Sequence, residues 1–168
     1  MASELGVQTI QHTNGTDALT IDSSGYADSS KSSVCVVRLA NEINTSANAE
    51  NKITYDTRVD DPNSWFDITT NHRFQPTVAG HYHIQATTRL NGETDFDIYD
   101  LIVRKNGDGS DEFRFSANQR RYTSATCSTI FSMNGSTDYV EVYVNFGTNL
   151  PIRANKNETC FIAQRILG

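Results

Sequence analysis

The chain has 168 residues and a mass of 18.7 kDa, which fits one compact domain with an appendage. Its 14 basic and 20 acidic residues leave a formal charge of −6, which argues against a protein that binds nucleic acid through the phosphate backbone. The longest good apolar run is VCVV at Val34–Val37, so we expect no membrane insertion. Thr, Ser and Asn are abundant whereas Leu and Lys are scarce, a composition that favours strands and loops over helices.

Residues 1–33 differ from the rest of the chain because they contain few side chains that can pack together. Asn14–Thr16 and Ser23–Gly25 are turn signals, and Ala18–Ile21 predicts one short strand. Such a segment cannot offset its own ordering entropy, so we expect an extended arm that another chain holds. The N-terminus lacks the basic start and apolar stretch of a secretory signal, which predicts synthesis in a cytoplasm.

From Val34 onward, short segments of alternating apolar and polar residues follow one another, separated by Gly, Asn, Asp and Pro, and none has a sustained helical period. Asn-Gly pairs within Arg89–Glu93, Arg104–Asp108 and Ser132–Thr137 predict tight hairpin turns. Many short strands joined by such turns indicate an all-β sandwich or jelly roll. The strands are expected near residues 34–40, 52–58, 65–69, 73–77, 80–90, 96–105, 112–117, 123–133, 138–146 and 158–166.

The alternation also assigns residues to faces. In the strand at 80–90, one side is mostly apolar and carries Tyr82, Ile84, Ala86, Thr88 and Leu90. Several of the opposite faces are rich in Tyr, Phe and Thr, and such faces are often buried between subunits. The residues that we expect at a subunit interface are Tyr139, Tyr143, Phe161, His81 and His83.

The stretch RFQPTVAGHYHIQATTRL, Arg73–Leu90, resembles the central motif of the complement C1q-like and tumour-necrosis-factor-like jelly roll. That motif has the form F-x-x-P-x-x-G-x-Y and matches Phe74, Pro76, Gly80 and Tyr82, with one residue fewer between Phe and Pro. Further matches occur in order at Lys52–Asp67, Leu101–Gly107, Ser128–Val144 and Thr159–Leu167. The resemblance covers residues 34–168 and implies a ten-stranded jelly-roll sandwich that assembles as a homotrimer and acts as a binding head, not as an enzyme.

A second resemblance concerns the N-terminus. The stretch MASELGVQTIQHTNGTDALTIDSSGY is similar to the opening of tail-fibre and other virion proteins of tailed bacteriophages, in which LTIDSSG segments recur. It implies a virion protein made in the host cytoplasm, whose residues 1–33 attach a head formed by residues 34–168 to another virion protein on the tail or capsid.

Two groups of residues are candidate metal ligands. His81 and His83 lie on one face of a strand, but no third ligand accompanies them, so lining an interface or facing solvent is the favoured interpretation and a shared metal is the alternative. Asp108, Ser110 and Glu112 alternate as oxygen ligands of calcium do, and some C1q-like heads bind calcium. A polar Asp-Gly turn is the favoured interpretation, so no cofactor is expected and calcium remains the alternative.

The remaining chemistry is sparse. No motif of a hydrolase, metalloprotease or nucleotide-binding enzyme is present, and a two-carboxylate glycosidase is the unsupported alternative. The three cysteines have no metal-ligand spacing and are expected as free, partly buried thiols, with a Cys127–Cys160 bridge as the alternative. The candidate ligand-binding residues are Arg120, Arg121, Tyr122, Asn149 and Asn155. Their side chains suit a polar or acidic glycan. The alternative for the two arginines is an intersubunit salt bridge.

The favoured function is a trimeric virion fibre or knob that adheres to a host-surface glycan through loops at the far end of its head. The predicted recognition loops are Asn91–Asp95, Gly107–Glu112, Gln119–Tyr122 and Gly147–Asn155. Decoration of the capsid without receptor binding is the first alternative. A secreted C1q-like binding module of a cellular organism is an alternative of another class.

Overall fold

The computed structural model describes residues 6–11, 13–15, 17–21, 23–28, 33–90, 95–120, 124–154 and 158–166, and for 17–18, 27–28, 95–98 and 117–120 it describes the backbone alone. Every regular element in these ranges is a strand. No helix long and apolar enough to cross a membrane occurs within these ranges. The chain divides into two compact units, Met1–Ser33 and Val34–Gly168, which are called the arm and the head below.

The arm contains one small antiparallel sheet of three consecutive strands, β1 (Thr9–Gln11), β2 (Asp17–Ile21) and β3 (Ala27–Asp28). The turns between them include Gly15 and Gly25, both with positive φ angles, 82° and 84°. These are the turn signals expected from the sequence, because glycine adopts positive φ without steric cost.

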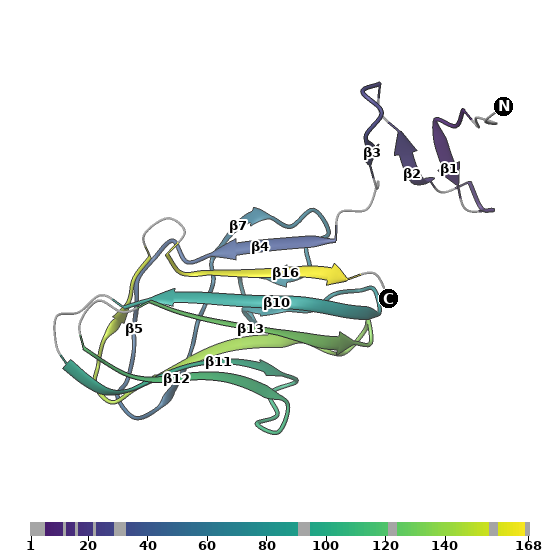
Figure 1. Cartoon of the computed structure of the whole chain (residues 1–168). Coiled ribbons are helices and arrows are strands. Elements are labelled where there is room, and N and C mark those ends of the chain that lie inside the picture. Colours follow the sequence, from purple (N-terminus) through teal and green to yellow (C-terminus); the bar gives the residue numbers. More distant parts are fainter. Residues whose placement is uncertain are drawn as a thin grey trace. The chain divides into compact units, whose positions relative to one another are not determined.

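The head is a sandwich of two antiparallel sheets (Figure 1). The five-stranded sheet has the order β13-β10-β16-β4-β7. Its strands are β4 (Val34–Arg38), β7 (Thr57–Asp60), β10 (Gly80–Arg89), β13 (Ser124–Met133) and β16 (Cys160–Ile166). The six-stranded sheet has the order β12-β11-β14-β9-β8, and β6 also pairs with β14. Its strands are β6 (Glu50–Lys52), β8 (Phe66–Asp67), β9 (Arg73–Phe74), β11 (Asp95–Lys105), β12 (Glu112–Arg120) and β14 (Val140–Phe146). A two-residue pair, β5 (Ile43–Asn44) with β15 (Pro151–Ile152), completes the head.

The core lies between the two sheets and is rich in aromatic rings. Phe74 and Tyr82, two residues of the C1q-like motif, are fully buried with ring centroids 5.5 Å apart. Trp65 packs edge-on against both, at 6.2 Å from Phe74 and 5.8 Å from Tyr82. Aromatic pairs with this geometry stabilise a core beyond the area that they bury. The motif residues therefore hold the two sheets together.

Two turns follow from local chemistry. Asn106 and Gly107 have φ angles of 55° and 69°, as the Asn-Gly pair of a tight hairpin requires, and they join β11 to β12. Gly135 has a φ of 72°, and a Cβ atom there would lie 2.4 Å from the backbone nitrogen of Ala79. The turn at Asn106 was predicted, although its connection runs on to Asp111 before β12 begins. The tight hairpin predicted at Asn134 is wrong, because β13 and β14, which this segment joins, lie in different sheets. The close approach at Gly135 is a tertiary contact that no local pattern reveals. The third predicted turn, at Asn91, lies outside the described residues.

The all-β jelly-roll prediction is confirmed, and most strands begin and end within a few residues of their predicted bounds. The strand predicted at 52–58 is wrong, because the chain there crosses from one sheet to the other. The Ile53 nitrogen donates to the Val142 carbonyl, whereas the Asp56 nitrogen donates to the Arg38 carbonyl in the opposite sheet. Ile53 and Tyr55 are both fully buried in the crossing, so the alternation seen in the sequence is real but does not belong to one strand.

The last strand, β16, shows which of two apolar faces enters the core. Phe161 and Ala163 are fully buried, whereas Ile162 is only partly buried and Ile166 is 38% exposed. Phe161 lies 5.2 Å from Phe66 and 5.7 Å from Phe74 between ring centroids. The assignment of Phe161 to a subunit interface is therefore wrong, because its ring is enclosed by its own subunit.

All three cysteines are free thiols, as expected, with only Cys160 partly exposed.

Candidate functional site

The outward faces of the two sheets differ sharply in chemistry. On the five-stranded sheet, the outward residues of β13 are Ser124, Thr126, Ser128, Ile130 and Ser132, and those of β16 are Cys160, Ile162, Gln164 and Ile166. None of these residues is charged. We call this surface the neutral face.

The register of the strands shows how the neutral face is built. Ile130 pairs with His83, and His83 pairs with Gln164, so these three side chains form one row across the sheet. The His83 ring nitrogen Nε2 lies 2.7 Å from the Ser128 hydroxyl, and the Thr87 and Thr126 hydroxyls are 3.1 Å apart. Short hydroxyl and imidazole side chains that bond to one another leave a flat surface. Ile130 stands out of it with 54% of its surface exposed.

Charge appears only toward the border of the neutral face. Arg89, at the end of β10, pairs with Glu158, which also accepts an ion pair from Arg153 Nε at 3.3 Å. Arg38 lies on β4, beyond Cys160 in the same row. The centre of the face therefore offers hydrogen-bonding and aliphatic groups but no ion pair.

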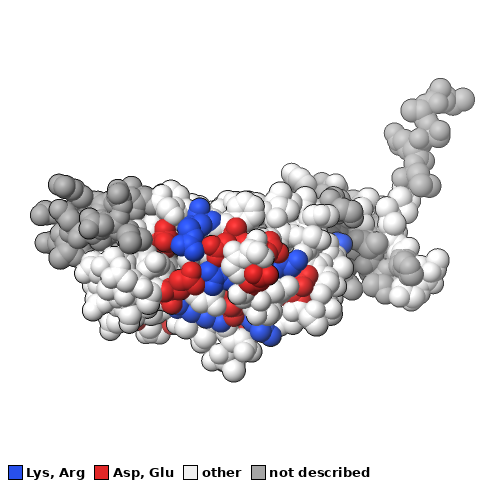
Figure 2. Space-filling view, turned by 90° about the horizontal axis from the view of Figure 1, so that it is seen from below, with Lys and Arg blue, Asp and Glu red and all other residues white. Residues whose placement is uncertain are grey.

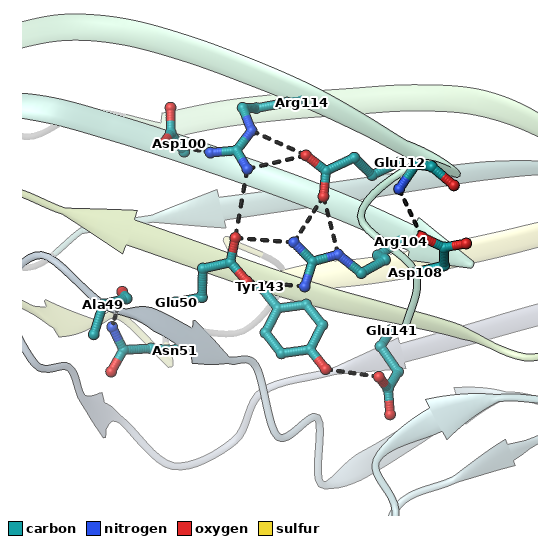
Figure 3. Close-up of polar contacts among 11 residues, drawn as sticks. Ala49, Glu50, Asn51, Asp100, Arg104, Asp108, Glu112, Arg114, Glu141 and Tyr143 are labelled. Atoms are coloured by element: carbon teal, nitrogen blue, oxygen red, sulfur yellow. Dashed lines mark hydrogen bonds and ion pairs between the residues drawn. The ribbon is translucent and has the colours of Figure 1, made fainter. Parts of the chain in front are cut away.

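The outward face of the six-stranded sheet is the opposite case, because basic and acidic side chains alternate across it (Figure 2). We call its central group the ion-pair network, and its members are Glu50, Asp100, Arg104, Glu112 and Arg114 (Figure 3). Arg104 donates to both oxygens of Glu50 at 2.8 and 2.9 Å, and to Glu112 Oε2 from Nε and Nη2 at 2.9 and 2.7 Å. Arg114 bridges Asp100 and Glu112 at 2.8 and 2.9 Å. Each guanidinium thus contacts at least two carboxylates.

The network continues through Tyr143. The Arg104 guanidinium carbon lies 5.0 Å from the centroid of the Tyr143 ring, and the Tyr143 hydroxyl donates to Glu141 Oε2 at 2.7 Å (Figure 3). Burial and the hydrogen bond to Glu141 raise the pKa of Tyr143 above its usual range. Lys52 pairs with the other oxygen of Glu141 and also bonds to the Asn71 carbonyl. The result is a continuous polar chain from the β12 edge to the loop before β9.

The ion-pair network covers apolar surface as well as satisfying charge. Ile102 alternates with the core residues Leu101 and Val103, so it points outward, yet it is fully buried. Its neighbours in the row are Arg114 and Tyr143, whose long side chains lie over it. Because the charges in the network are already paired with one another, this face is better suited to solvent than to binding a charged ligand.

The structure separates the residues predicted at one subunit interface. His81 and His83 lie on the neutral face, whereas Tyr143 lies on β14 of the opposite sheet, Tyr139 directly precedes that strand, and Phe161 is in the core. The Tyr139 ring is covered by the Arg73 guanidinium at 4.2 Å. The period-two pattern identified outward tyrosines correctly but did not show that the two sheets face opposite directions.

The predicted ligand-binding residues receive little support from geometry. Arg121, Tyr122 and Asn155 lie outside the described residues, and Arg120 is described only by its backbone pairing with Asp95. The Asn149 side-chain oxygen accepts the Ala47 backbone N–H at 2.6 Å, so it orders a loop of its own subunit.

The weak calcium candidates form a hairpin turn. Asp108 Oδ1 accepts the Ser110 backbone N–H at 2.9 Å, and these hydrogen bonds lower the pKa of Asp108. Both oxygens of Glu112 accept hydrogen bonds from Arg104 and Arg114, so that carboxylate is not free to bind a cation. Among the residues that the structure describes, no three His, Cys, Asp or Glu side chains are grouped to hold a metal ion.

The ends of the head carry different elements. At one end, Leu90 pairs with Ile152, and Arg89 pairs with Ser124, so the strand ends that flank three of the predicted recognition loops meet there. The fourth predicted loop, Gly107–Glu112, follows the opposite ends of the strands, where Asn106 bonds to Asp138 at 2.8 Å. Val34, where the head begins, also lies at this second end, because it pairs with Gln164 beside the His81–Ile166 pair.

The ion-pair network was missed in the sequence. Glu112 and Arg104 pair across the connection between β11 and β12, but a tight two-residue turn at Asn106 and Gly107 would have placed Gly109 opposite Arg104, so the predicted turn did not reveal this pair. Glu50 lies 54 residues before Arg104 and comes from a strand that pairs with β14, which no local signal indicates.

Comparison with solved structures identifies the fold. The crystal structure of murine APRIL at pH 8.0 matches with a TM-score of 0.64 at 14% identity, covering 81% of this chain and all of that one. The globular domain of zebrafish complement 1qA matches with a TM-score of 0.57 at 18% identity, covering 82% of this chain and 98% of that one. The PRD1 vertex protein P5 matches with a TM-score of 0.55 at 16% identity, covering 80% of this chain and 95% of that one. The head therefore has the jelly-roll fold of TNF-like and C1q-like domains. No family model matches the chain, and no curated protein matches it.

Proposed function

We propose that the chain is a non-enzymatic structural protein of a bacteriophage particle. The head forms a homotrimer, the arm attaches it to another virion protein on the tail or capsid, and loops at the far end of the head bind a host-surface glycan. The observation that carries the trimer is the neutral face, whose two strands β13 and β16 present no outward charge.

The neutral face suits contact with further copies of the chain for two reasons. Interfaces are depleted of charged residues at their centre, and the opposite face of the same head is crowded with them. The five strands hold 36 residues in all, and at about 3.4 Å of rise and about 4.8 Å of strand spacing they span about 590 Å² of sheet. A standard stable interface buries roughly 800 Å² per partner, so most of this sheet is expected to take part in the contacts. His81 and His83 are then interface residues, as the sequence suggested.

The attachment role is supported by the separation of the two ends. The arm joins the head at Val34, at the end opposite the cluster of strand ends around Leu90 and Ile152. A head held through its arm therefore presents the loops that follow Leu90, Arg120 and Ile152 away from its point of attachment. Loops on a rigid scaffold are the usual carriers of recognition.

The virion setting is supported by two resemblances of different kinds. The LTIDSSG stretch within the arm is similar to segments of tailed-phage virion proteins. The fold of the head also occurs in the PRD1 vertex protein P5, which its name places at a vertex. Both favour a particle component over a secreted module of a cellular organism.

The experiment that tests this function compares the full chain with a variant lacking residues 2–30. Light scattering should give both a mass three times that of one chain, because the head carries the subunit contacts. Only the full chain should incorporate into particles when each is supplied to a phage that lacks the gene. A monomer at micromolar concentration refutes the trimer, and normal incorporation of the deletion variant refutes attachment through the arm.

A further inference from the structure

The arm sheet has one aliphatic face. Directly paired residues in antiparallel strands point to the same side of a sheet, and so do residues two apart. Ile10 pairs with Leu19, and Leu19 and Ile21 lie two apart on β2, so these three share one side. Thr9 and Thr20 pair with each other and lie on the other side. We call these two surfaces the aliphatic face and the threonine face of the arm.

The described residues of the arm leave the aliphatic face partly open to solvent. None of the side chains described between residues 6 and 28 is fully buried: Leu19 and Ile21 are half-buried, and Ile10 is 49% exposed. The strands have three, five and two residues, and a sheet this small with no covered face is not stable by itself in water. The backbone pairing, including the Ile21 N–H to Gln8 carbonyl bond of 2.8 Å, therefore requires an apolar surface from another chain.

We propose that the aliphatic faces of the three arms of one trimer pack against one another around a common axis, as a three-sided β-prism. This inference rests on the homotrimer proposed above and names the partner of the arm as two further copies of itself. The threonine faces then point outward and form the surface that the particle contacts.

Tethering favours this partner over any other. Six backbone steps of about 3.8 Å join Asp28 to Val34, so each arm sheet stays within about 23 Å of the start of its own head. Three heads held in one trimer therefore keep their arms at an effective concentration on the order of millimolar. A separate protein of equal affinity has to reach that concentration before it competes for the same face.

The chemistry of the arm is also compatible with self-association. From Leu5 to Thr16 the sequence contains no Asp, Glu, Lys or Arg, so three identical β1 strands can approach without repulsion between like charges. The three aliphatic side chains themselves, Ile10, Leu19 and Ile21, carry no charge that selects a partner of opposite charge. Ile and Leu side chains that meet around an axis bury apolar surface from all three chains at once.

Cysteine crosslinking in the full-length trimer tests the arrangement directly. Single variants Ile10→Cys, Leu19→Cys and Ile21→Cys put a thiol on the aliphatic face, and Thr9→Cys and Thr20→Cys put one on the threonine face. Mild oxidation should give disulfide-linked dimers on a denaturing gel from at least one aliphatic-face variant, at ten or more times the yield of either threonine-face variant. The unsubstituted chain, treated in parallel, reports any reaction of Cys160.

A pair of adjacent charge substitutions provides the second measurement. Ile10→Asp should abolish hydrogen-exchange protection of the Ile21 amide, whereas Thr9→Asp, which lies opposite Thr20 on the threonine face, should leave it protected, and the head should remain trimeric in both. Equal crosslinking from both faces, or equal protection in both variants, overturns the prism while leaving the trimeric head intact. A monomeric full chain overturns the proposed trimer and the prism together.

Discussion

Arg104 and Glu50 form a bidentate pair, with Nη1 2.8 Å from Oε2 and Nη2 2.9 Å from Oε1. Their strands, β11 and β6, do not pair with each other, since each is hydrogen-bonded to β14. The pair therefore spans β14 and ties the short strand β6 to the β11–β12 hairpin. Arg104 also holds Glu112, so one side chain with only 12% of its surface exposed compensates two carboxylates.

Replacing Arg104 should destabilise the head. Arg104→Gln leaves Glu112 with one guanidinium partner instead of two, and we expect a loss of about 2–4 kcal/mol in the free energy of unfolding. Urea denaturation measures this loss. Lys105→Gln is the matched control, because the Lys105 ammonium makes only longer ion pairs, at 3.4 Å to Asp138 and 3.9 Å to Asp111, and its loss should cost less than about 1 kcal/mol. Similar losses in the two variants contradict a special role for the network.

Stability should fall in acid. The hydrogen bond from Arg104 lowers the pKa of Glu50, and the pKa of Glu112 is also lowered, because bonds from Arg104 and Arg114 outweigh the opposing effect of burial. Backbone N–H groups of Thr70, Thr69 and Asn71 lower the pKa of Asp67. A carboxyl whose folded pKa lies below its unfolded value, about 4 for these residue types, adds stability above that value and loses it as pH falls through the folded pKa.

The urea midpoint should therefore be nearly constant from pH 7 to about pH 5 and decrease below about pH 4. Glu50→Gln and Asp67→Asn should each reduce the dependence on pH in that acidic range, because each removes one of the carboxyls responsible. A pH profile that is unchanged in both variants shows that other groups control acid unfolding.

The sequence was sufficient for the fold but not for all of the surface. Tyr82, Ile84 and Ala86 alternate with polar residues, so their burial was predicted correctly. The last strand is apolar on both sides, with Phe161 on one and Ile162 on the other, so periodicity alone does not choose between them. Glu50 and Arg104 meet because two distant strands pair with a third, and such contacts depend on topology.

Adjacent substitutions in β16 should separate assembly from folding. Ile162→Asp introduces a charge at the centre of the neutral face, and we expect a folded monomer with an unchanged circular dichroism spectrum. Phe161→Ala removes a fully buried ring and should cost about 3–5 kcal/mol of unfolding free energy. Light scattering and urea denaturation of both variants provide the comparison. A trimeric Ile162→Asp variant with wild-type affinity between subunits shows that the interface lies elsewhere.

The recognition role predicts that the isolated trimer binds host cells or purified host polysaccharide. Arginine and tyrosine suit this task, because a guanidinium forms forked bonds to acidic groups and a phenol ring stacks on a sugar. One site should bind weakly, and three sites per trimer should strengthen attachment by about a hundredfold or more through avidity.

Combined Arg121→Ala and Tyr122→Ala substitution should abolish binding of the fluorescently labelled trimer to host cells without changing its thermal midpoint. Substitution of Asp108 by Ala, in the loop at the other end of the head, is the control and should bind as the unsubstituted trimer does. If the unsubstituted trimer binds no host material, yet particles that lack it break at lower temperature, the protein decorates and stabilises the capsid instead.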